Sequence, residues 1–493
     1  MGDDVSDAVR HGPVIVWLRQ DLRIADHPAL SAAAETGRSV LPVYVLDDAT
    51  PGAWRMGGAS RWWLHSSLAA LAGRLKGLGS RLILRRGRTI DVLEQLAKET
   101  GASAIYVTRG YEPWAVADEV ALKAFGDRNG IEVRRFSGAL LFEPEAIRTK
   151  DGGPFRVFTP FWKACLAAGE PGRSLPTPSK LKAPAAWPAS DGLDTWGLLP
   201  QKPDWAGGLR QTWTPGEAGA SARLRDFIDG SLGDYAISRD RPDLPGTSML
   251  SPHLHFGEIS PRQCWHSVRM AEGAGARGAA SYLRELGWRE FSTHLLFQFP
   301  AITDAPFRPE FASFPWTGGR EAKAALAAWQ RGQTGYPIVD AGMRQLWHTG
   351  WMHNRVRMIV ASLLTKHLRI HWHEGARWFW DTLVDADLAN NSASWQWVAG
   401  SGADAAPYFR IFNPVLQGQK FDPDGAYVRH WVPELARMPA AHIHMPWEAP
   451  VSVLAAAGLD LGRTYPQPIV DHGKARVAAL AAYEDVKAAA NKS

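Results

Sequence analysis

Three short segments of this sequence carry side chains that could bind a ligand or take part in a reaction. The first, Thr247–Ser251 (TSMLS), places hydroxyl groups directly before a Ser-Pro pair that is typical of a helix start. Hydroxyls and the free N–H groups of a helix N-terminus suit phosphate oxygens. An ordinary N-cap uses the same residues, so this motif alone favours a cap, and a phosphate site is the alternative.

The other two segments combine acidic and aromatic side chains. Asp385–Asn391 holds two carboxylates and an amide and leads into Trp395-Gln-Trp397. Carboxylates beside aromatic rings can hydrogen-bond to a heteroaromatic ligand, or they can cap a helix. Glu285, Trp288 and Arg289 have the spacing that places them on one helical face. Such a face is either a stacking platform with a polar partner or core packing with a surface ion pair.

Other kinds of chemistry find less support. His371 and His373 flank Trp372, but this spacing does not place two ligands on one helical face, so no metal site is predicted. The chain has no Gly-x-Ser-x-Gly elbow. Its two cysteines, Cys165 and Cys264, are too few for a Cys₄ zinc site or a four-thiolate iron–sulfur cluster. They also argue against a disulfide framework, which fits a reducing cytoplasm.

The composition of the chain is that of a globular protein with two or three domains. It has 493 residues, of which 45% are hydrophobic and 21% charged. No apolar run is long enough to span a membrane, and the N-terminus lacks a signal-peptide core, so a cytoplasmic location is expected. The net charge of +5 permits a local basic face for DNA, but alone it favours a solvated, slightly basic surface. Tryptophan is unusually frequent, with 23 residues against 10 tyrosines.

The first part of the chain alternates short apolar runs with helical patterns, which predicts a parallel sheet with helices on both faces. The predicted strands are Val14–Leu18, Val40–Leu46, Arg81–Arg85, Ala104–Thr108 and Glu132–Phe136. The predicted helices are Ser60–Leu78, Thr89–Thr100 and Ala115–Asn129. No Gly-x-Gly-x-x-Gly follows a strand, so a dinucleotide fingerprint is missing. The carboxyl ends of the strands could still bind a ligand.

The rest of the chain divides into a connector and a helical part. Residues 143–215 are rich in Pro, Gly, Ser and Lys without a sustained period, which predicts a long connector over the surface, held in place by Trp187, Trp196, Trp205 and Trp213. From residue 216 onward helical patterns dominate, including Ser281–Phe299 and His353–Leu368. We therefore predict an α/β domain over residues 12–142, a connector over 143–215 and an all-helical domain over 216–490.

Five motifs in sequence order resemble the cryptochrome/photolyase family. They are Gly335–Arg344 (GYPIVDAGMR), Trp351–Met358 (WMHNRVRM), Leu383–Asp387 (LVDAD), Trp395–Trp397 (WQW) and Tyr408–Pro414 (YFRIFNP). The segment VIVWLRQDLRIADHPAL is similar to the opening strand and loop of the same family. The resemblance covers nearly the whole chain, from Gly12 to the C-terminus, and these motifs are highly specific.

The resemblance implies a Rossmann-like, doubly wound antenna domain, a connector and a helical domain that holds a U-shaped FAD. By motif, the nucleotide part of the flavin would be held by Tyr235, Arg239, Thr247, Ser248, Leu250 and Ser251. The remainder would be surrounded by Tyr282, Arg289, Asn354, Arg357, Asp385, Asp387 and Asn391. Asn391 would face flavin N5. Plant cryptochromes commonly have aspartate there, so asparagine favours a repair enzyme with an anionic reduced flavin.

The resemblance also implies a pocket for a flipped-out cyclobutane pyrimidine dimer in UV-damaged DNA. Its lining would be Glu285, Trp288, Asn354, Met358 and Trp397. Two tryptophan faces would sandwich the extruded bases, and the glutamate would hydrogen-bond to a dimer carbonyl. Photoexcited reduced FAD would donate an electron to the dimer, and the cyclobutane ring would split. Phosphates near the lesion would be held by Arg355 and Arg410.

Departures from the family patterns indicate the subtype. Enzymes for (6-4) photoproducts usually have histidines where this chain has Asn354 and Met358, which favours cyclobutane dimers. The iron–sulfur branch needs four cysteines. Residues Met56–Leu71 (MGGASRWWLHSSLAAL) resemble the bacterial class III photolyases and their plant-cryptochrome relatives. We expect a bacterial monomer that needs no metal and that lies at the nucleoid when bound to damage.

Three tryptophans match the family's electron-transfer triad, namely Trp395 nearest the flavin, then Trp372, then Trp316. The resemblance to class III members also implies a 5,10-methenyltetrahydrofolate antenna, with Glu112 as a contact, while a deazaflavin antenna or no antenna stays open. Two rival functions are a cryptochrome-type blue-light photoreceptor without repair activity and a flavoprotein that binds DNA structurally. The second rival leaves Glu285 and Met358 without a role.

Overall fold

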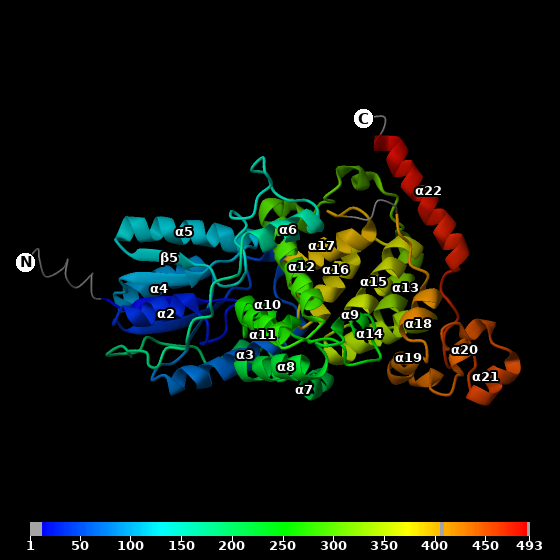
Figure 1. Ribbon diagram of the computed structural model, residues 1–493, viewed down its shortest axis with the longest axis horizontal. Coiled ribbons are helices and arrows are strands. Elements are labelled where there is room, and N and C mark those ends of the chain that lie inside the picture. Colours follow the sequence, from blue (N-terminus) through cyan, green and yellow to red (C-terminus); the bar gives the residue numbers. More distant parts are fainter. Residues whose placement is uncertain (1–11, 405–408, 491–493) are drawn as a thin grey trace, which may run out of the picture.

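The structure is a computed structural model that describes residues 12–404 and 409–490. It has a sheet-containing part at one end and a larger helical part at the other (Figure 1). Tyr408, the first residue of one of the family motifs, lies outside the described residues. Within the described residues, no helix is long and apolar enough to cross a membrane.

A five-stranded parallel sheet forms the N-terminal part, with strand order β3-β2-β1-β4-β5. Its strands are β1 (Val14–Leu18), β2 (Val40–Leu46), β3 (Ile83–Arg86), β4 (Ala104–Thr108) and β5 (Glu132–Phe136). Four of them have the predicted bounds. The third begins later than predicted because Arg81 leaves the ladder. Its guanidinium lies over the Trp187 ring at 5.0 Å and donates to the Pro188 carbonyl at 2.6 Å.

Helices cover both faces of this sheet, as the alternation predicts. One face packs against α2 (Pro28–Glu35) and α3 (Gly58–Gly77), and the other against α4 (Thr89–Thr100) and α5 (Pro113–Asn129). Successive side chains of β1 point to opposite faces, so Val14 and Val16 enter the first layer and Ile15 enters the second. Helix α2 was not predicted. It is short, and His27 caps it by accepting from the Leu30 N–H at 3.2 Å.

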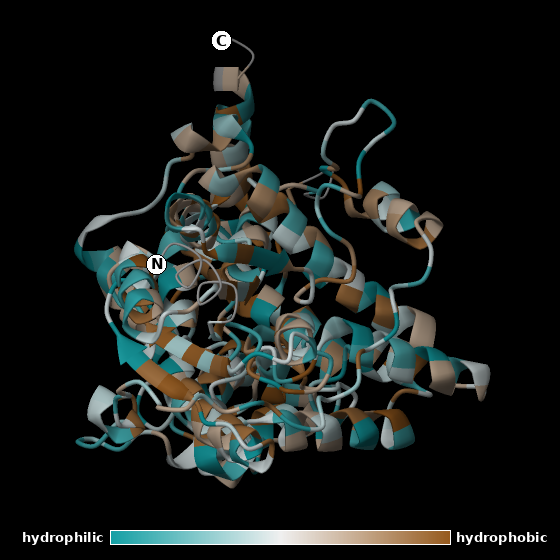
Figure 2. Cartoon of the chain, turned by 90° about the vertical axis from the view of Figure 1, so that its left-hand side faces the viewer, coloured by the Kyte–Doolittle hydropathy of each residue, from teal (hydrophilic) through white to brown (hydrophobic). Residues whose placement is uncertain are grey.

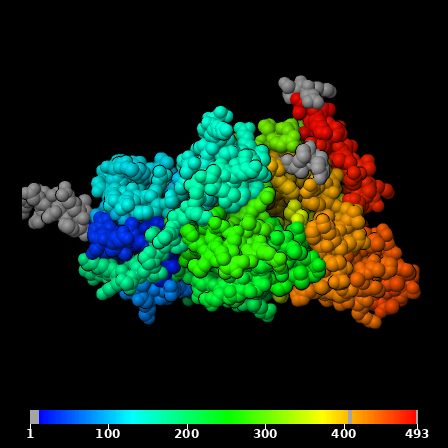
Figure 3. All heavy atoms as spheres, in the orientation of Figure 1, coloured from blue at the N-terminus to red at the C-terminus, as the bar shows by residue number. Residues whose placement is uncertain are grey.

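The connector crosses the boundary between the two parts of the molecule (Figure 3). Its composition suggested a segment without regular structure. The connector nevertheless contains α6 (Phe158–Ala167), a 3₁₀ turn at Leu193–Trp196 and α7 (Gly207–Thr212). Trp196 and Trp213 are buried, and the Trp213 indole donates to the Thr349 carbonyl at 2.7 Å. These tryptophans therefore hold the connector against the folded core, as predicted.

The C-terminal part is helical. Figure 2 views the molecule from its sheet-containing end and shows hydrophilic and hydrophobic residues mixed along the helices. Its first helices are α8 (Glu217–Gly230), α9 (Tyr235–Ser238), α10 (Ser251–His255), α11 (Pro261–Gly273), α12 (Ala279–Gln298), α13 (Gly319–Gln330), α14 (Pro337–Thr349), α15 (Asn354–Ser362), α16 (Trp372–Thr382) and α17 (Leu388–Ala399). They are followed by α18 (Pro414–Phe421), α19 (Ala426–Trp431), α20 (Ala440–Ile443), α21 (Val451–Ala457) and α22 (His472–Ala490).

The helix predicted over His353–Leu368 is divided. Regular α-helix ends at Ser362, and a π-helical turn, η5 (Leu363–His367), follows. Lys366 lies in that turn, is buried, and donates to the Ala399 carbonyl at the end of α17 at 2.7 Å. Apolar periodicity alone does not distinguish a π turn from a regular one, which is why the sequence did not reveal it.

A buried carboxyl group joins α12 to the start of the connector. Glu290 is fully buried and accepts from the backbone N–H groups of Leu141 and Phe142 at 2.8 and 3.1 Å. Burial raises the pKa of Glu290 to about 7. Between pH 4.5, the usual pKa of a glutamate, and about pH 7, the folded state therefore holds a proton that the unfolded state has released. The contribution of Glu290 to stability falls as the pH rises through that window.

We expect Glu290→Gln to be more stable than the wild type at pH 8, by on the order of 1–3 kcal/mol. The glutamine amide oxygen can still accept from both N–H groups, and no buried charge forms. Melting temperatures at pH 5 and pH 8 test this, because the difference between variant and wild type should appear mainly at the higher pH. A difference that is equal at both pH values would contradict the assignment.

Candidate functional site

Two packed helices, α12 and α17, carry several of the predicted flavin, lesion and electron-transfer residues. They supply Tyr282, Glu285, Trp288 and Arg289 from the first and Asn391, Trp395 and Trp397 from the second. The spacing of the α12 residues places them along one side of the helix. Residues that the sequence assigns to the flavin and to the lesion are thus interleaved on one helix pair.

Glu285 and Arg239 form an ion pair in the structure, although the sequence assigned them to different ligands. Arg239 follows α9, and its guanidinium also lies over the Tyr235 ring at 5.5 Å. The Tyr235 ring in turn lies 5.5 Å from the ring of Tyr282. The carboxylate predicted to meet the dimer therefore already has a charged partner, which holds it in one orientation.

The Thr247–Ser251 segment lies at the start of α10, as its sequence predicts. Met249 has a positive φ of 49°, which marks a tight turn before the helix. The Ser251 hydroxyl accepts from the Trp351 indole at 3.3 Å, and Tyr282 hydrogen-bonds to Ser248. Leu250 is buried, so the loop is anchored by one apolar side chain while its hydroxyls line one side.

The acidic segment before α17 is rigidly held. Asp385 is buried and pairs with Arg357 at 2.8 Å. Asp387 caps α17 by accepting from the Asn390 N–H at 2.8 Å. Burial alone would raise the pKa of Asp387, but hydrogen bonding and the charge of His255 hold it well below its usual range. Asp387 therefore stays ionised at neutral pH, which makes it an acceptor for N–H or O–H groups of a ligand.

Helix α15 begins at the predicted lesion pocket. Asn354 is exposed at its first turn, and Met358 is partly buried. Arg355 pairs with Asp240 at 2.8 Å, and its guanidinium lies over the Phe421 ring at 4.6 Å. A phosphate bound by Arg355 would therefore share this guanidinium with Asp240.

Other predicted residues differ in how firmly the fold holds them. Asn391 donates from its side-chain amide to the Ala376 carbonyl at 3.0 Å, which orients its side chain. Arg410 lies in the irregular segment before α18. The structure therefore brings Asn391 to the flavin group of residues and leaves Arg410 on a loop.

The three predicted electron-transfer tryptophans lie in one hydrophobic cluster. Trp395 and Trp372 are buried, whereas Trp316 packs against the cluster and is only partly buried. The ring of His371 lies 5.7 Å from that of Trp372 and 4.9 Å from that of Trp316. The order from buried to partly exposed agrees with a path from the interior to the surface.

Trp395 fits tightly against α16. A Cβ atom at Gly375 would lie 2.1 Å from the Trp395 ring, so this position accepts only glycine without displacing the indole. The two lesion-stacking candidates, Trp288 and Trp397, are each only partly buried. Their indole faces are therefore closer to solvent than that of Trp395, as a platform for an incoming base requires.

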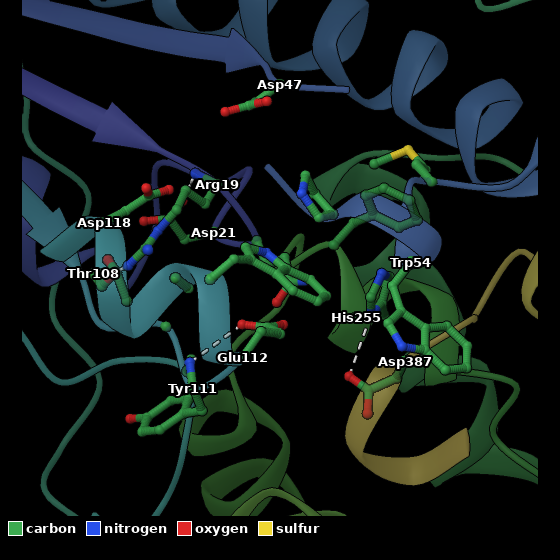
Figure 4. Close-up of a pocket in the computed structure, with 18 of the residues that line it drawn as sticks. Arg19, Asp21, Asp47, Trp54, Thr108, Tyr111, Glu112, Asp118, His255 and Asp387 are labelled. Carbon is green, nitrogen blue, oxygen red and sulfur yellow. Dashed lines mark hydrogen bonds and ion pairs between the residues drawn. The ribbon is translucent and has the colours of Figure 1, made fainter. Parts of the chain in front are cut away.

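A separate pocket lies at the carboxyl ends of β1, β2 and β4, where open α/β sheets bind ligands (Figure 4). Glu112 lines it and accepts from the Tyr111 N–H at 3.2 Å. On the side of the helical domain, Arg289 and Asp387 line the same pocket. Burial, with the nearby charge of Asp47, raises the pKa of Asp118 in its wall to about 6. Two predicted flavin residues thus share a pocket with the predicted antenna contact.

Several residues around these sites were not singled out from the sequence. They are Phe158, Asp404, Asp118 and His255. Asp118 and His255 line the pocket, and their sequence neighbours give no signal of that. Phe158 and Asp404 belong to segments far apart in the chain that only the fold brings together. Among the described residues, no group of three or more His, Cys, Asp or Glu side chains could hold a metal ion.

The donor set fits a flavin dinucleotide. Hydroxyls at the start of α10 suit a diphosphate. The carboxyl groups of Asp385 and Asp387, with the oriented Asn391, suit the donor and acceptor edge of a flavin ring. Tyr282, whose pKa burial raises well above its usual value, keeps its proton at neutral pH. No residue in this set conflicts with that ligand.

Comparisons with known proteins agree with this arrangement. Residues 14–182 match the family model described as DNA photolyase, and residues 282–485 match the FAD binding domain of DNA photolyase. A deoxyribodipyrimidine photo-lyase of Agrobacterium fabrum is 53% identical over 97% of this chain and 99% of its own. Cryptochrome-2 of Arabidopsis thaliana is 41% identical over 94% of this chain and 77% of its own.

A solved structure gives the same result. The crystal structure of a bacterial class III photolyase from Agrobacterium tumefaciens superposes with a TM-score of 0.93, at 53% identity, and covers 97% of this chain and 98% of that chain. The resemblance drawn from the motifs, and the fold class expected from it, are therefore confirmed. This chain belongs to the cryptochrome/photolyase family.

Proposed function

We propose that this chain is a light-dependent DNA repair enzyme, a deoxyribodipyrimidine photo-lyase of the class III type that acts on cyclobutane pyrimidine dimers. The observation that carries the proposal is the helix pair α12 and α17, which interleaves flavin-binding residues with Glu285, Trp288 and Trp397. A flavin and a flipped-out dimer bound there would be neighbours. A structural DNA-binding protein would not need that juxtaposition.

The flavin would be held by residues from four elements. The loop before α10 would take the diphosphate, and Arg357, Asp385 and Asn391 would surround the ring. Bound FAD, in its reduced anionic form, would supply the light-driven electron that opens the cyclobutane ring. The chain itself contributes orientation and charge, because the Arg357–Asp385 pair at 2.8 Å fixes one side of the ring site.

The dimer would be held by stacking and by a charged hydrogen-bonding group. Trp288 and Trp397 would stack on the extruded bases, each contact contributing about 1–3 kcal/mol. Glu285, oriented by Arg239, would accept a hydrogen bond from a base N–H group or share a proton of its own with a base carbonyl. Because a damaged base pair is weaker than an intact one, the cost of flipping favours the lesion over normal DNA.

The proposal is tested by incubating photoreduced protein with dimer-containing oligothymidine under blue light. Absorbance near the thymine band should recover in the light and not in the dark. Binding of the oligonucleotide without recovery, with fully reduced flavin, would favour the photoreceptor alternative. The same protein kept oxidised serves as the control.

We further propose that the pocket at the sheet edge takes the antenna chromophore, 5,10-methenyltetrahydrofolate. Flat heteroaromatic rings with N–H donors suit a pocket that combines Trp54 with the carboxylates of Glu112 and Asp118. We expect Glu112→Gln to weaken binding of added methenyltetrahydrofolate by on the order of tenfold, because a charged acceptor is lost.

A titration followed by the absorbance of the bound folate measures this effect. Glu94→Gln, on α4 and outside the pocket, is the matched control and should bind as the wild type does. Equal affinity of both variants would remove Glu112 from the antenna site.

The remaining proposals concern partner and location. The substrate would be chromosomal DNA, so the chain would act in the cytoplasm at the nucleoid, and we propose that it does so as a monomer. Phosphate contacts from Arg355 and Arg410 would make its DNA affinity fall with rising salt concentration.

A further inference from the structure

One connector residue, Phe158, lies against the tryptophan that α12 offers to the lesion. The rings of Phe158 and Trp288 are stacked, with centroids 3.8 Å apart and an interplanar angle of 8°. Phe158 is almost completely buried. The Trp162 ring also lies nearly parallel to the Phe158 ring, with centroids 6.4 Å apart. One face of Trp288 is therefore occupied by the connector, which leaves the opposite face for a ligand.

The backbone of Phe158 is held from a distant part of the chain. Phe158 is the first residue of α6, and the preceding Val157 has no side-chain acceptor to cap that helix. Asp404 supplies the missing acceptor, since its carboxylate takes the Phe158 N–H at 3.2 Å. A carboxylate at a helix N-terminus is also favoured by the helix dipole.

Asp404 holds the second tryptophan as well. Its backbone carbonyl accepts from the Trp397 indole N–H at 3.1 Å. Asp404 adopts a positive φ of 51°, a conformation that costs energy in a residue other than glycine and that therefore needs support from its surroundings. Its two hydrogen bonds, one from the side chain and one from the backbone, provide that support.

We infer that Phe158 and Asp404 are positioning residues that set the two tryptophan faces of the lesion pocket relative to each other. The chain of contacts runs from Trp288 through the Phe158 ring and its N–H to Asp404, and from the Asp404 carbonyl to Trp397. This inference rests on the proposed function, because it assigns the two tryptophans to a dimer. Neither residue touches the dimer or the flavin in this scheme.

The benefit of such an arrangement is preorganisation. A sandwich for two bases loses affinity when either indole is free to rotate, because binding must then also order that side chain. Because Phe158 and Asp404 are joined to each other, they hold the distance between the Trp288 and Trp397 indoles as well as the orientation of each. The effect should therefore appear in the preference for damaged over undamaged DNA, since phosphate contacts are not involved.

The experiment compares affinities of photolesion-containing and undamaged oligonucleotides. We expect Asp404→Ala to weaken binding of dimer-containing DNA about three- to tenfold, the range for one lost hydrogen bond. Asp404→Asn keeps a side-chain acceptor and should retain most of the affinity. Phe158→Leu should weaken binding by a similar factor through loss of the ring stack. Affinity for undamaged DNA and flavin content should stay unchanged in all three variants.

Two further measurements exclude a merely structural effect. Phe155→Leu alters a ring in the same connector that packs on Phe161 and not on Trp288, and it should bind as the wild type does. Two double variants test the coupling: one combines Asp404→Ala with Trp397→Ala, and the other combines Phe158→Leu with Trp288→Ala. Each should lose affinity by a smaller factor than the product of the factors lost by its two single variants. Fully multiplicative losses, or equal losses on damaged and undamaged DNA, would overturn the inference.

Failure of this inference is distinguishable from failure of the proposed function. If the wild type does not prefer dimer-containing DNA, the proposed function is wrong. If the wild type shows the preference and both Asp404→Ala and Phe158→Leu keep it, only the positioning role is wrong.

Discussion

We expect Glu285→Ala to lower kcat/KM for dimer repair about ten- to hundredfold, measured with pre-reduced protein under blue light. The variant would lose the charged hydrogen bond to the dimer that we propose for Glu285. It also leaves Arg239 without the carboxylate that it pairs with in the structure. Flavin content should change little, because Arg357, Asp385 and the loop before α10 are unaffected.

Two variants sharpen this prediction. Glu285→Gln keeps a hydrogen-bonding side chain of the same size and should lose less activity than Glu285→Ala. Glu272→Ala removes a partly exposed glutamate that pairs with Arg269 on α11, and it should repair dimers at the wild-type rate. If Glu285→Ala repairs as fast as Glu272→Ala, the glutamate has no role in the lesion pocket.

The second large effect is expected for Trp395→Phe, which should lose nearly all photoreduction of oxidised flavin. A phenyl ring is much harder to oxidise than an indole, so the first step of the path toward Trp372 and Trp316 is removed. The ring still fills the space beside Gly375, which limits the damage to packing. Repair by chemically pre-reduced protein should remain close to that of the wild type.

The measurement is the rate of flavin bleaching under blue light with an external reductant, compared with repair by pre-reduced protein. Trp265→Phe is the matched control, because Trp265 is a buried tryptophan of a different hydrophobic cluster. It should photoreduce normally. Parallel loss of photoreduction and repair in Trp395→Phe would indicate a folding defect and would contradict the electron-transfer role.

The strands β1, β2 and β4 could be predicted because they are buried throughout and read as continuous apolar runs, whereas β5 is partly or fully exposed along its length. The third strand shows the limit, since Leu82 is apolar and buried but Arg81 turns away to the connector. Helix α6 was missed for a different reason. Phe158, Phe161 and Cys165 have helical spacing and are all buried, but they lie in a segment whose Pro and Gly content indicated a connector.

The sequence predicts the site as a set of residues and does not predict the network of contacts between them. Motif order identified Glu285 and Arg239 separately. Their ion pair joins residues 46 positions apart, and the sequence does not indicate which of its many arginines pairs with Glu285. The contact between Phe158 and Asp404 spans 246 positions. Pairings of this kind depend on how helices are placed in space, which local sequence patterns do not encode. The domain boundaries at residues 142 and 215 stay predictions.

The shared wall of the sheet-edge pocket has a thermodynamic consequence. Asp387 caps the helix that carries the flavin residues, and it also lines the pocket with Glu112. Any ligand in that pocket that restrains Asp387 would change the affinity of the flavin site. By linkage, the flavin would change the affinity of the pocket by the same factor. If the pocket takes folate as proposed, flavin-depleted protein should bind folate with a different affinity from flavin-loaded protein, so that occupancy of one site changes occupancy of the other at a given ligand concentration.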